Sequence, residues 1–328
     1  MKKIAVLGAG VIGSIVGGYL ARAGGDLTFI DINKGHMDAI NAKGLTLHDM
    51  DDNIDIEIPG IKAVTSTEGL DVMDIIVVLV KGNFTETALS ASRNIIGPDT
   101  YLVSFQNGIG NDVLLEEFAD DSHIMLGNMM VSGALLQPGT VSVSKSSAAA
   151  DGTHASMYPL KPNEENVETA RLIKEMLYAG GGMTVKLSEH IQTSIWNKAL
   201  LNIGCNPVCG LIRCNIGYTF NDPDAQFVMK ALVRECIAVS DALGVPGVTY
   251  EGWYKAQSEH VKTQAFYHYP STAQDLLKRK VPTEIGTLCG SIVAYGKKLG
   301  IPTPVNETIY HLVLACEHNY EHQYKDEP

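Results

Sequence analysis

A glycine-rich turn close to the N-terminus limits the possible folds more than any other feature of this chain. Its residues are Gly8, Ala9, Gly10, Val11, Ile12 and Gly13. The turn follows an apolar strand predicted over Lys3–Leu7 and opens a helix predicted over Val11–Ala23, a context that gives the G-x-G-x-x-G pattern its meaning. Gly8 permits the tight turn, Gly10 lets a pyrophosphate approach the backbone, and Gly13 lets helix and strand pack closely. The sequence therefore predicts a dinucleotide-binding βαβ unit that holds the anion at the helix start.

Strand and helix patterns continue to alternate through the first half of the chain. Asp74–Val80 is apolar and rich in β-branched residues, as expected of a strand buried on both faces. Further strands are expected over Leu27–Ile30, Tyr101–Phe105, Ile124–Gly127 and Thr184–Lys186, edge or hairpin strands over Thr140–Ser144 and Ser156–Tyr158, and helices over His36–Ala42 and Thr85–Ile96. This alternation predicts a mostly parallel sheet covered by helices.

The pattern becomes helical from about Ser188 onward. Helices are expected over Glu189–Gly204, Asp224–Leu243, Gly252–Gln264, Pro282–Leu299 and Asn306–Tyr320. The predicted fold class is an α/β Rossmann-type domain over residues 1–187, followed by an all-α domain over residues 188–328. Both lengths are ordinary, since single domains usually hold about 100–200 residues.

Three polar side chains follow predicted strands of the sheet. Asp31 closes the second strand, where a carboxylate accepts hydrogen bonds from adenosine ribose hydroxyls and repels a 2′-phosphate. Asp31 therefore favours NAD and leaves NADP open, and a plain helix cap is its alternative role. Lys81 and Asn107 end later strands, and ligands bind at the carboxyl ends of such strands. We expect both to meet cofactor or substrate; the alternatives are a solvated lysine and a simple turn before glycine.

Lys198, Asn202 and Asn206 are four residues apart in an apolar segment of the second half. A four-residue step places all three side chains along one face of a helix. A partly desolvated lysine has a lowered pKa and is a better acid near neutrality. The two amides can hold a carbonyl or carboxylate. A solvated lysine on an outer helix face is the alternative for Lys198.

Two further candidates lie downstream. Glu284 follows Pro282 at a predicted helix start, where the helix dipole stabilises a carboxylate. Glu284 could pair with Lys198 or bind a ribose or substrate hydroxyl, or it could be an ordinary helix-start glutamate. Ser271 could donate to a substrate carboxylate, or it could cap the helix predicted over Thr272–Leu277.

Charge and cysteine content exclude other functions. The formal net charge of −12 argues against a nucleic-acid partner, because such binding needs clustered Lys and Arg. The start MKKIAVLGAG reaches the glycine turn too soon for a signal peptide, and no apolar stretch attains the about 20 residues of a membrane span. The six cysteines, Cys205, Cys209, Cys214, Cys236, Cys289 and Cys316, contain no C-x-x-C pair. We therefore expect reduced thiols, no metal site, no membrane or nucleic-acid partner and a cytoplasmic location.

These motifs, in this order, resemble one known family across nearly the whole chain. They are G-A-G-V-I-G at Gly8–Gly13, V-K-G at Val80–Gly82, Q-N-G-I-G at Gln106–Gly110, W-N-K-A-L-L-N-I-G-C-N-P at Trp196–Pro207, S-T-A-Q-D at Ser271–Asp275 and T-E-I at Thr283–Ile285. The sequence is similar to the ketopantoate reductases (2-dehydropantoate 2-reductases). The resemblance implies a Rossmann domain and an all-helical domain with the active site in the cleft between them.

The resemblance also implies roles for single residues. The family's general acid falls on Lys198, and its substrate-binding residues fall on Asn202, Asn206 and Ser271. Glu284 matches a residue that contributes to cofactor and substrate binding. Lys81 and Asn107 match residues on the cofactor side.

The chain departs from the family pattern in places. Many members use NADPH and carry a basic residue where this chain has Asp31. Asp31, H-Y-P-S at His268–Ser271 and C-N-I-G at Cys214–Gly217 are more similar to an NAD-dependent branch that reduces branched or aromatic 2-oxo acids to D-2-hydroxy acids. The expected activity is reduction of a small-molecule 2-oxo acid, ketopantoate to D-pantoate first, with that branch as the alternative. A non-catalytic nicotinamide sensor is the rival class, and a homodimer is one option for assembly.

Overall fold

The protein is represented by a computed structural model that describes residues 2–146, 149, 151–262 and 266–323. Two compact units emerge from the contacts within it. The first contains Met1–Gln106 and Asn111–Ile191, and the second contains Asn107–Gly110 and Gln192–Pro328. The segment Asn107–Gly110 therefore belongs by its contacts to the second unit although the first unit surrounds it in sequence.

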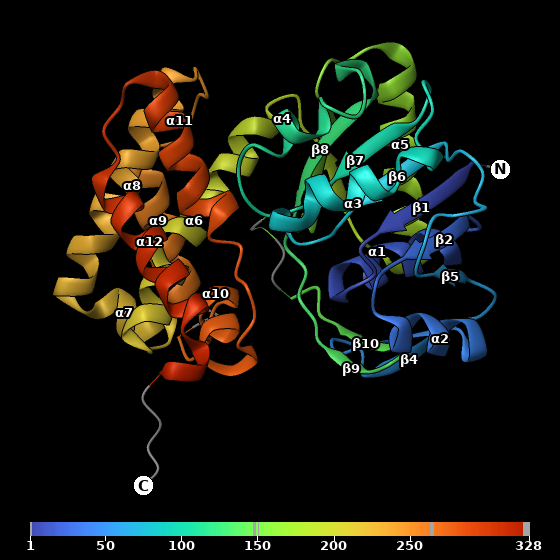
Figure 1. Cartoon of the computed structure of the whole chain (residues 1–328), viewed down its shortest axis with the longest axis horizontal. Coiled ribbons are helices and arrows are strands. Elements are labelled where there is room, and N and C mark those ends of the chain that lie inside the picture. Colours follow the sequence, from blue (N-terminus) through green and yellow to red (C-terminus); the bar gives the residue numbers. More distant parts are fainter. Residues whose placement is uncertain (1, 147–148, 150, 263–265, 324–328) are drawn as a thin grey trace, which may run out of the picture. The chain divides into compact units, whose positions relative to one another are not determined.

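An eight-stranded sheet forms the centre of the first unit (Figure 1), with strand order β12-β11-β8-β7-β6-β1-β2-β5. The strands are β1 (Lys3–Leu7), β2 (Asp26–Ile30), β5 (Lys62–Val64), β6 (Ile75–Val78), β7 (Tyr101–Ser104), β8 (Ile124–Met129), β11 (Ala155–Pro159) and β12 (Val185–Leu187). The strands from β5 to β8 are parallel, in the order of dinucleotide-binding sheets. The predicted parallel sheet is confirmed.

Helices cover both faces of this sheet. The helices of the unit are α1 (Val11–Arg22), α2 (Lys34–Lys43), α3 (Thr85–Ala91), α4 (Asn111–Leu115) and α5 (Glu164–Gly181). Apolar residues of α1 and α5 share one core with β1 and β2. Helix α3 lies on the other face (Figure 1). Strands β6 and β7 are fully buried, which explains their continuous apolar sequence.

A second sheet of four strands, in the order β4-β3-β10-β9, was not expected from the sequence. It contains β3 (Leu45–Asp49), β4 (Ile54–Ile58), β9 (Leu135–Gln137) and β10 (Thr140–Val143). Strand β10 forms the expected hairpin, with β9. The edge or hairpin position predicted for Ser156–Tyr158 is wrong, because β11 pairs with β8 on one side and β12 on the other. Residues of β11 alternate between buried and half-buried, a pattern that edge strands also show.

Helix α5 was also missed, although the side chains at its start cap it on both sides. The Asn163 side chain accepts a hydrogen bond from the Asn166 N–H, and the Asn166 side chain accepts one from the Asn163 N–H, each at 2.9 Å. This reciprocal arrangement is a capping box. Asparagine at the third helical position replaces the usual Glu or Gln, which hides the pattern from a sequence search.

The described elements of the second unit are helical. They are α6 (Ile191–Ile212), α7 (Ile216–Asn221), α8 (Pro223–Ala242), α9 (Tyr250–His260), α10 (Ser271–Gln274), α11 (Ser291–Leu299) and α12 (Pro304–His318), with π-helical turns at Asp275–Arg279 and Gly286–Gly290. The expected helical second half is confirmed. Helix α6 continues past Pro207, where its residues are buried in the core of the unit. Among the described helices, none is long and apolar enough to span a bilayer.

The packing of α1 against α5 depends on a glycine. A Cβ placed on Gly180 would lie 1.9 Å from the carbonyl oxygen of Tyr19. Gly180→Ala should therefore destabilise the first unit by about 1–3 kcal/mol, the usual cost of overpacking. Gly35→Ala in α2 is the matched control, since its Cβ would meet nothing closer than 3.8 Å.

The stability of both variants would be measured by thermal melting followed by circular dichroism. Tryptophan fluorescence is unsuitable, because both tryptophans, Trp196 and Trp253, lie in the second unit and the substitutions lie in the first. An unchanged melting temperature in Gly180→Ala would contradict the close approach of the two helices.

Candidate functional site

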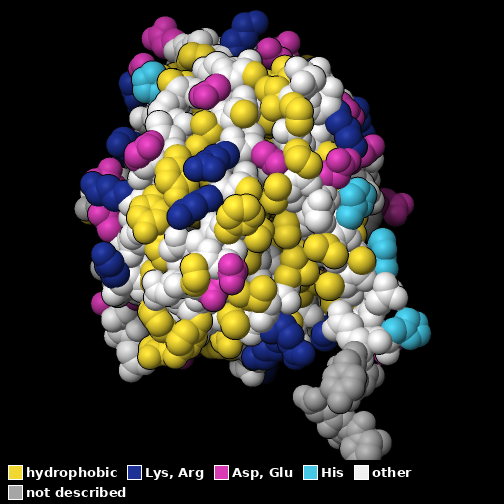
Figure 2. All heavy atoms as spheres, turned by 90° about the vertical axis from the view of Figure 1, so that its left-hand side faces the viewer, with side chains coloured by type: hydrophobic (Ala, Val, Ile, Leu, Met, Phe, Trp, Pro, Cys, Tyr) yellow, Lys and Arg dark blue, Asp and Glu magenta, His cyan; other side chains and the backbone are white. Residues whose placement is uncertain are grey.

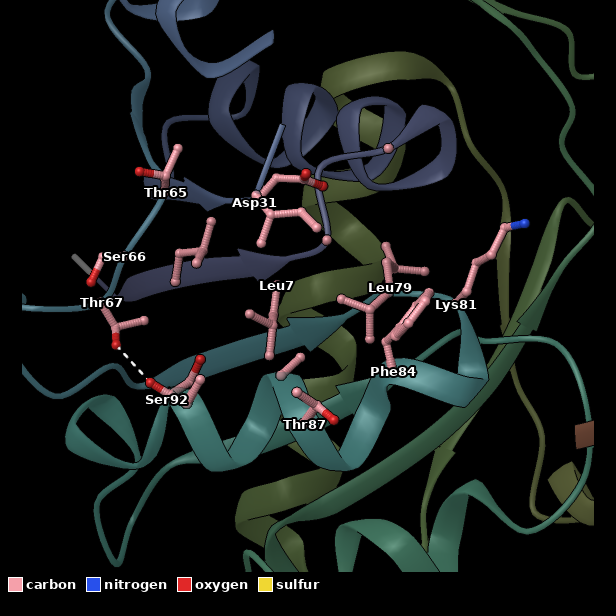
Figure 3. Close-up of a pocket in the computed structure, with 17 residues that line it drawn as sticks. Leu7, Asp31, Thr65, Ser66, Thr67, Leu79, Lys81, Phe84, Thr87 and Ser92 are labelled. Atoms are coloured by element: carbon pink, nitrogen blue, oxygen red, sulfur yellow. Dashed lines mark hydrogen bonds between the residues drawn. The ribbon is translucent and has the colours of Figure 1, made fainter. Parts of the chain in front are cut away.

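A cavity of about 500 Å³ lies at the carboxyl ends of β1, β2 and β6 in the first unit (Figure 3). Strand β1 lies between β2 and β6, so the chain changes direction across the sheet at this point. Parallel α/β sheets bind ligands at such a switch point. The cavity lining includes Gly8, Gly10, Asp31, Thr65, Ser66 and Lys81. The cavity therefore occupies the place and has the lining expected of a dinucleotide site.

The three glycines of the turn have different steric surroundings. Gly8 has a φ of +96°, and a Cβ there would lie 2.4 Å from the Val80 nitrogen. A Cβ on Gly13 would lie 1.9 Å from the Gly8 oxygen, which confirms the close packing of helix on strand. Gly10 is exposed and would place its Cβ in open space. The backbone is thus accessible at Gly10, where α1 begins.

The remaining residues of the turn lie at the start of helix α1. Ala9 is buried, and Val11 and Ile12 are half-buried in the first turn of α1. The free N–H groups of a helix start carry partial positive charge and suit a phosphate. The turn therefore fits a pyrophosphate without any basic side chain.

Asp31 directly follows β2 and lines the same cavity. One carboxylate oxygen accepts a hydrogen bond from the Asn33 N–H at 2.8 Å. The cap of α2 is Asn33, whose side chain accepts from the His36 N–H. The alternative role of Asp31 as the cap of the next helix is therefore wrong, and its carboxylate is held at the cavity by the turn before α2.

Lys81 and two hydroxyl groups lie at opposite ends of the cavity. Lys81 is half-buried and follows β6, as expected, while Thr65 and Ser66 follow β5 (Figure 3). Neither hydroxyl was predicted from the sequence, because β5 contains only three residues, Lys62–Val64, and is too short to be recognised. Their Thr-Ser pair after a short apolar segment was the only available signal.

In the second unit, α6 carries the three residues of the four-residue step. Lys198, Asn202 and Asn206 lie in one continuous helix, which confirms the predicted geometry. Lys198 and Asn202 are half-buried, and Asn206 is buried. The amides and the ammonium group are therefore partly withdrawn from water.

Burial lowers the pKa of Lys198 to about 8, while the carboxylate of Glu284 acts in the opposite direction and raises it. The desolvation anticipated from the apolar sequence around Lys198 is therefore present. A lysine with this pKa exchanges its proton near neutral pH. Glu284 precedes the π-helical turn Gly286–Gly290, so the helix start predicted at Pro282 is too early, and Glu284 lies just before the first helical turn.

The segment Asn107–Gly110 packs against the same part of the second unit. The Asn107 side-chain amide donates to a Glu284 carboxylate oxygen at 3.3 Å, and the Ile109 N–H donates to the Thr287 carbonyl at 2.9 Å. Gly108 has a φ of +96°, and a Cβ there would lie 2.5 Å from the Thr287 oxygen. The structure therefore brings together Asn107, Glu284 and, through its electrostatic effect, Lys198.

Ser271 is the first residue of α10 and is exposed. The residue that caps α10 is Pro270, so the alternative role of Ser271 as a helix cap is wrong. Asn215, in the C-N-I-G turn at Cys214–Gly217, is buried and caps α7 by accepting from the Tyr218 N–H. All six cysteines are free thiols. Within the described ranges no cluster of three His, Cys, Asp or Glu side chains could hold a metal.

Comparisons with known proteins agree with these features. Residues 4–154 match the family model described as Ketopantoate reductase PanE/ApbA, and residues 190–317 match the model of its C-terminal part. The chain is 31% identical over 318 residues to the 2-dehydropantoate 2-reductase of Pyrococcus horikoshii, covering 96% of this chain and 97% of that protein. It is 26% identical over 313 residues to the same enzyme of Streptococcus pyogenes, covering 95% and 97%.

Solved structures show the same fold along both chains. D-mandelate dehydrogenase with NADH and anilino(oxo)acetate has a TM-score of 0.85 and 27% identity, covering 97% of this chain and 99% of that one. The PanE/ApbA family ketopantoate reductase of Ralstonia eutropha JMP134 has a TM-score of 0.82 and 26% identity with the same coverage. The chain belongs to the ketopantoate reductase, or 2-dehydropantoate 2-reductase, family of nicotinamide-dependent oxidoreductases.

Proposed function

We propose that this protein reduces the C2 carbonyl of a 2-oxo acid to the D-2-hydroxy acid, with ketopantoate as the first candidate substrate. The observation that carries the proposal is Lys198, whose pKa burial lowers to about 8 on a helix face shared with two amides. A proton donor beside hydrogen-bonding amides is what the reduction of a carbonyl next to a carboxylate requires.

In this proposal each residue has a defined task. A bound reduced nicotinamide supplies the hydride. Lys198 donates its proton to the oxygen of the C2 carbonyl as negative charge develops there. Glu284 raises the pKa of Lys198 and so keeps more of it protonated at neutral pH. Asn107 donates to Glu284 and thereby orients its carboxylate.

The polar residues of the helical unit would hold the substrate. Asn202 and Asn206 are one helical turn apart, so their amides can bind the carboxylate and a neighbouring hydroxyl together. Ser271 would donate to the same ligand from the start of α10. Fixing the substrate beside the proton donor supplies much of the acceleration, because binding has already met the entropy cost of bringing the reacting groups together.

The preferred cofactor in this proposal is NAD. Asp31 lies in the cavity after β2, where a 2′-phosphate would meet its negative charge. Thr65 and Ser66 add only neutral hydroxyls to the described lining. Lys81 would meet the cofactor at the other end of the cavity. NADP remains the alternative cofactor. We also propose that the chain divides into a cofactor domain over residues 1–187 and a substrate domain over residues 188–328.

A second substrate class competes within the same chemistry. The D-mandelate dehydrogenase structure, with its TM-score of 0.85, favours a branched or aromatic 2-oxo acid. Ketopantoate carries a hydroxyl that the site must hydrogen-bond, and a site built for that group discriminates strongly against acids without it. A non-catalytic sensor would need no proton donor, so the lowered pKa of Lys198 argues against that class.

Assembly as a homodimer stays a prediction. Apolar side chains gather on the face of the helical unit in Figure 2. Tyr218 and Phe227 of this unit are 59% and 77% exposed. Exposed aromatic residues are common where subunits associate. Light scattering in solution would test whether the protein is a dimer.

The first experiment compares ketopantoate, 2-oxoisocaproate and benzoylformate, each with NADH and with NADPH, by following the absorbance of the reduced nicotinamide. We expect the highest kcat/KM with ketopantoate and NADH. A higher value with the bulkier acids would assign the protein to the D-2-hydroxy acid branch, and a preference for NADPH would contradict the role given to Asp31. Cofactor binding without turnover of any acid would overturn the proposal.

Removal of the proposed acid provides the second test. Lys198→Ala should lower kcat by at least ~10²-fold, the lower range for loss of a general acid. Lys255→Ala, on an exposed position of α9, is the matched control and should leave kcat unchanged. Turnover close to wild type in Lys198→Ala would show that another group supplies the proton.

The pH profile tests the electrostatic arrangement. Reduction needs protonated Lys198, so kcat/KM should fall as the pH rises through about 8. Glu284→Gln removes the charge that raises this pKa and should move the limb to lower pH. Glu284→Asp keeps the charge and should leave the limb above that of the Gln variant. A limb that does not move in Glu284→Gln would contradict the coupling.

A further inference from the structure

A buried histidine lies in a series of three hydrogen bonds that runs from the β9–β10 hairpin to the glycine turn of the first unit. The Gly139 N–H donates to His36 Nδ1 at 2.9 Å, His36 Nε2 lies 3.0 Å from Ser14 Oγ, and Ser14 Oγ donates to the Ala9 carbonyl at 2.9 Å. The hairpin between β9 and β10 is thus connected through α2 and α1 to the turn. These residues are distant in sequence, and only the fold brings them together.

The donor and the acceptor of each of these three hydrogen bonds can be assigned. A backbone N–H only donates, so His36 Nδ1 must accept and carries no proton. The ring proton therefore lies on Nε2 and is donated to Ser14 Oγ, which leaves the Ser14 hydroxyl to donate to Ala9. Burial lowers the pKa of His36, while Asp31 raises it less, and this favours the neutral ring. Both side chains are buried, so water does not replace a lost bond.

The last bond fixes the orientation of a peptide group in the turn. The Ala9 carbonyl and the Gly10 N–H belong to one planar trans peptide, in which they point in opposite directions. Ala9 is buried and its carbonyl is held inward by Ser14, so the Gly10 N–H is directed the other way. Gly10 is exposed and lines the cavity.

The backbone of the same histidine is linked through Asn33 to Asp31, which lines the cavity. The His36 N–H donates to the Asn33 side chain at 3.2 Å, and the Asn33 N–H donates to Asp31 at 2.8 Å. One residue therefore connects the backbone beside Gly10 with the carboxylate beside the proposed ribose position.

We propose that His36, acting through Ser14, is a positioning residue that holds the glycine turn in its dinucleotide-binding orientation. It touches neither substrate nor cofactor; it aims the Gly10 N–H at the phosphate. The inference rests on the proposed function only in requiring that the first unit binds a nicotinamide dinucleotide. It predicts a defect in binding the dinucleotide and no defect in proton transfer.

Three variants test the chain of bonds. Ser14→Ala removes the bond to Ala9 and leaves only a methyl group. His36→Asn keeps an oxygen that can accept from Gly139 but is too short to reach Ser14. The double variant combines them. His48→Asn is the matched control, since His48 lies on β3 in the same unit and its ring pairs with Asp55 instead.

The measurements are the Kd of the apoprotein for ADP-ribose by calorimetry, the KM for NADH and kcat at saturating NADH. Each single variant should raise the Kd and the KM about 3- to 10-fold, as for one lost hydrogen bond, with kcat unchanged. The double variant should be no worse than the worse single variant, because both act on one chain. His48→Asn should bind as wild type, and circular dichroism spectra that match the wild type at the assay temperature would exclude unfolding as the cause.

Other outcomes would overturn the inference. A wild-type Kd in folded Ser14→Ala and His36→Asn would show that the turn keeps its orientation unaided. Multiplied effects in the double variant would show that the two residues act separately. A fall in kcat at saturating NADH, with the Kd unchanged, would place the effect at the chemical step. Failure of the wild-type protein to bind ADP-ribose would overturn the proposed function itself, a result distinct from these.

Discussion

The close approach of α1 to β1 is the constraint on which the first unit depends. A side chain at Gly13 would collide with the Gly8 carbonyl, so only glycine lets the helix begin directly above the strand. This contact sets the place where the helix start meets the carboxyl ends of β2 and β6. The same helix then reaches α5 through the contact of Tyr19 with Gly180. The position of the cavity and the packing of the core therefore follow from one local steric requirement.

The second unit depends on a different kind of constraint. Burial makes its Lys198 less basic, and the negative charge of Glu284 restores part of that basicity. The opposing effects leave a pKa of about 8, close to the range in which proton donation is most useful. Burial in an apolar helix creates this property, and Asn107, from a segment far away in sequence, contributes by donating to Glu284. The acidity of the proposed proton donor is thus a consequence of packing.

The sequence predicted the elements whose patterns are local. The strand β1, the glycine turn and α1 follow from adjacent residues, and the helix containing Lys198, Asn202 and Asn206 follows from a four-residue step. Elements stabilised by distant partners were missed. Strands β3 and β4 form half of a sheet completed by β9 and β10, nearly a hundred positions later, and the buried Asp49 carboxylate pairs with Lys145 at 3.0 Å across that sheet. No local pattern signals such pairing.

The sequence by itself determined the dinucleotide turn, the carboxylate of Asp31 after the second strand, the aligned polar face of α6 and the family, because each is written in short ordered motifs. Only the tertiary structure decided the magnitude of the Lys198 pKa, the contact of Asn107 with Glu284 and the hydrogen bonds from Gly139 to Ala9. The physical reason is common to all three. Burial and hydrogen-bond direction are properties of groups brought together by folding, and no single segment of the chain contains them.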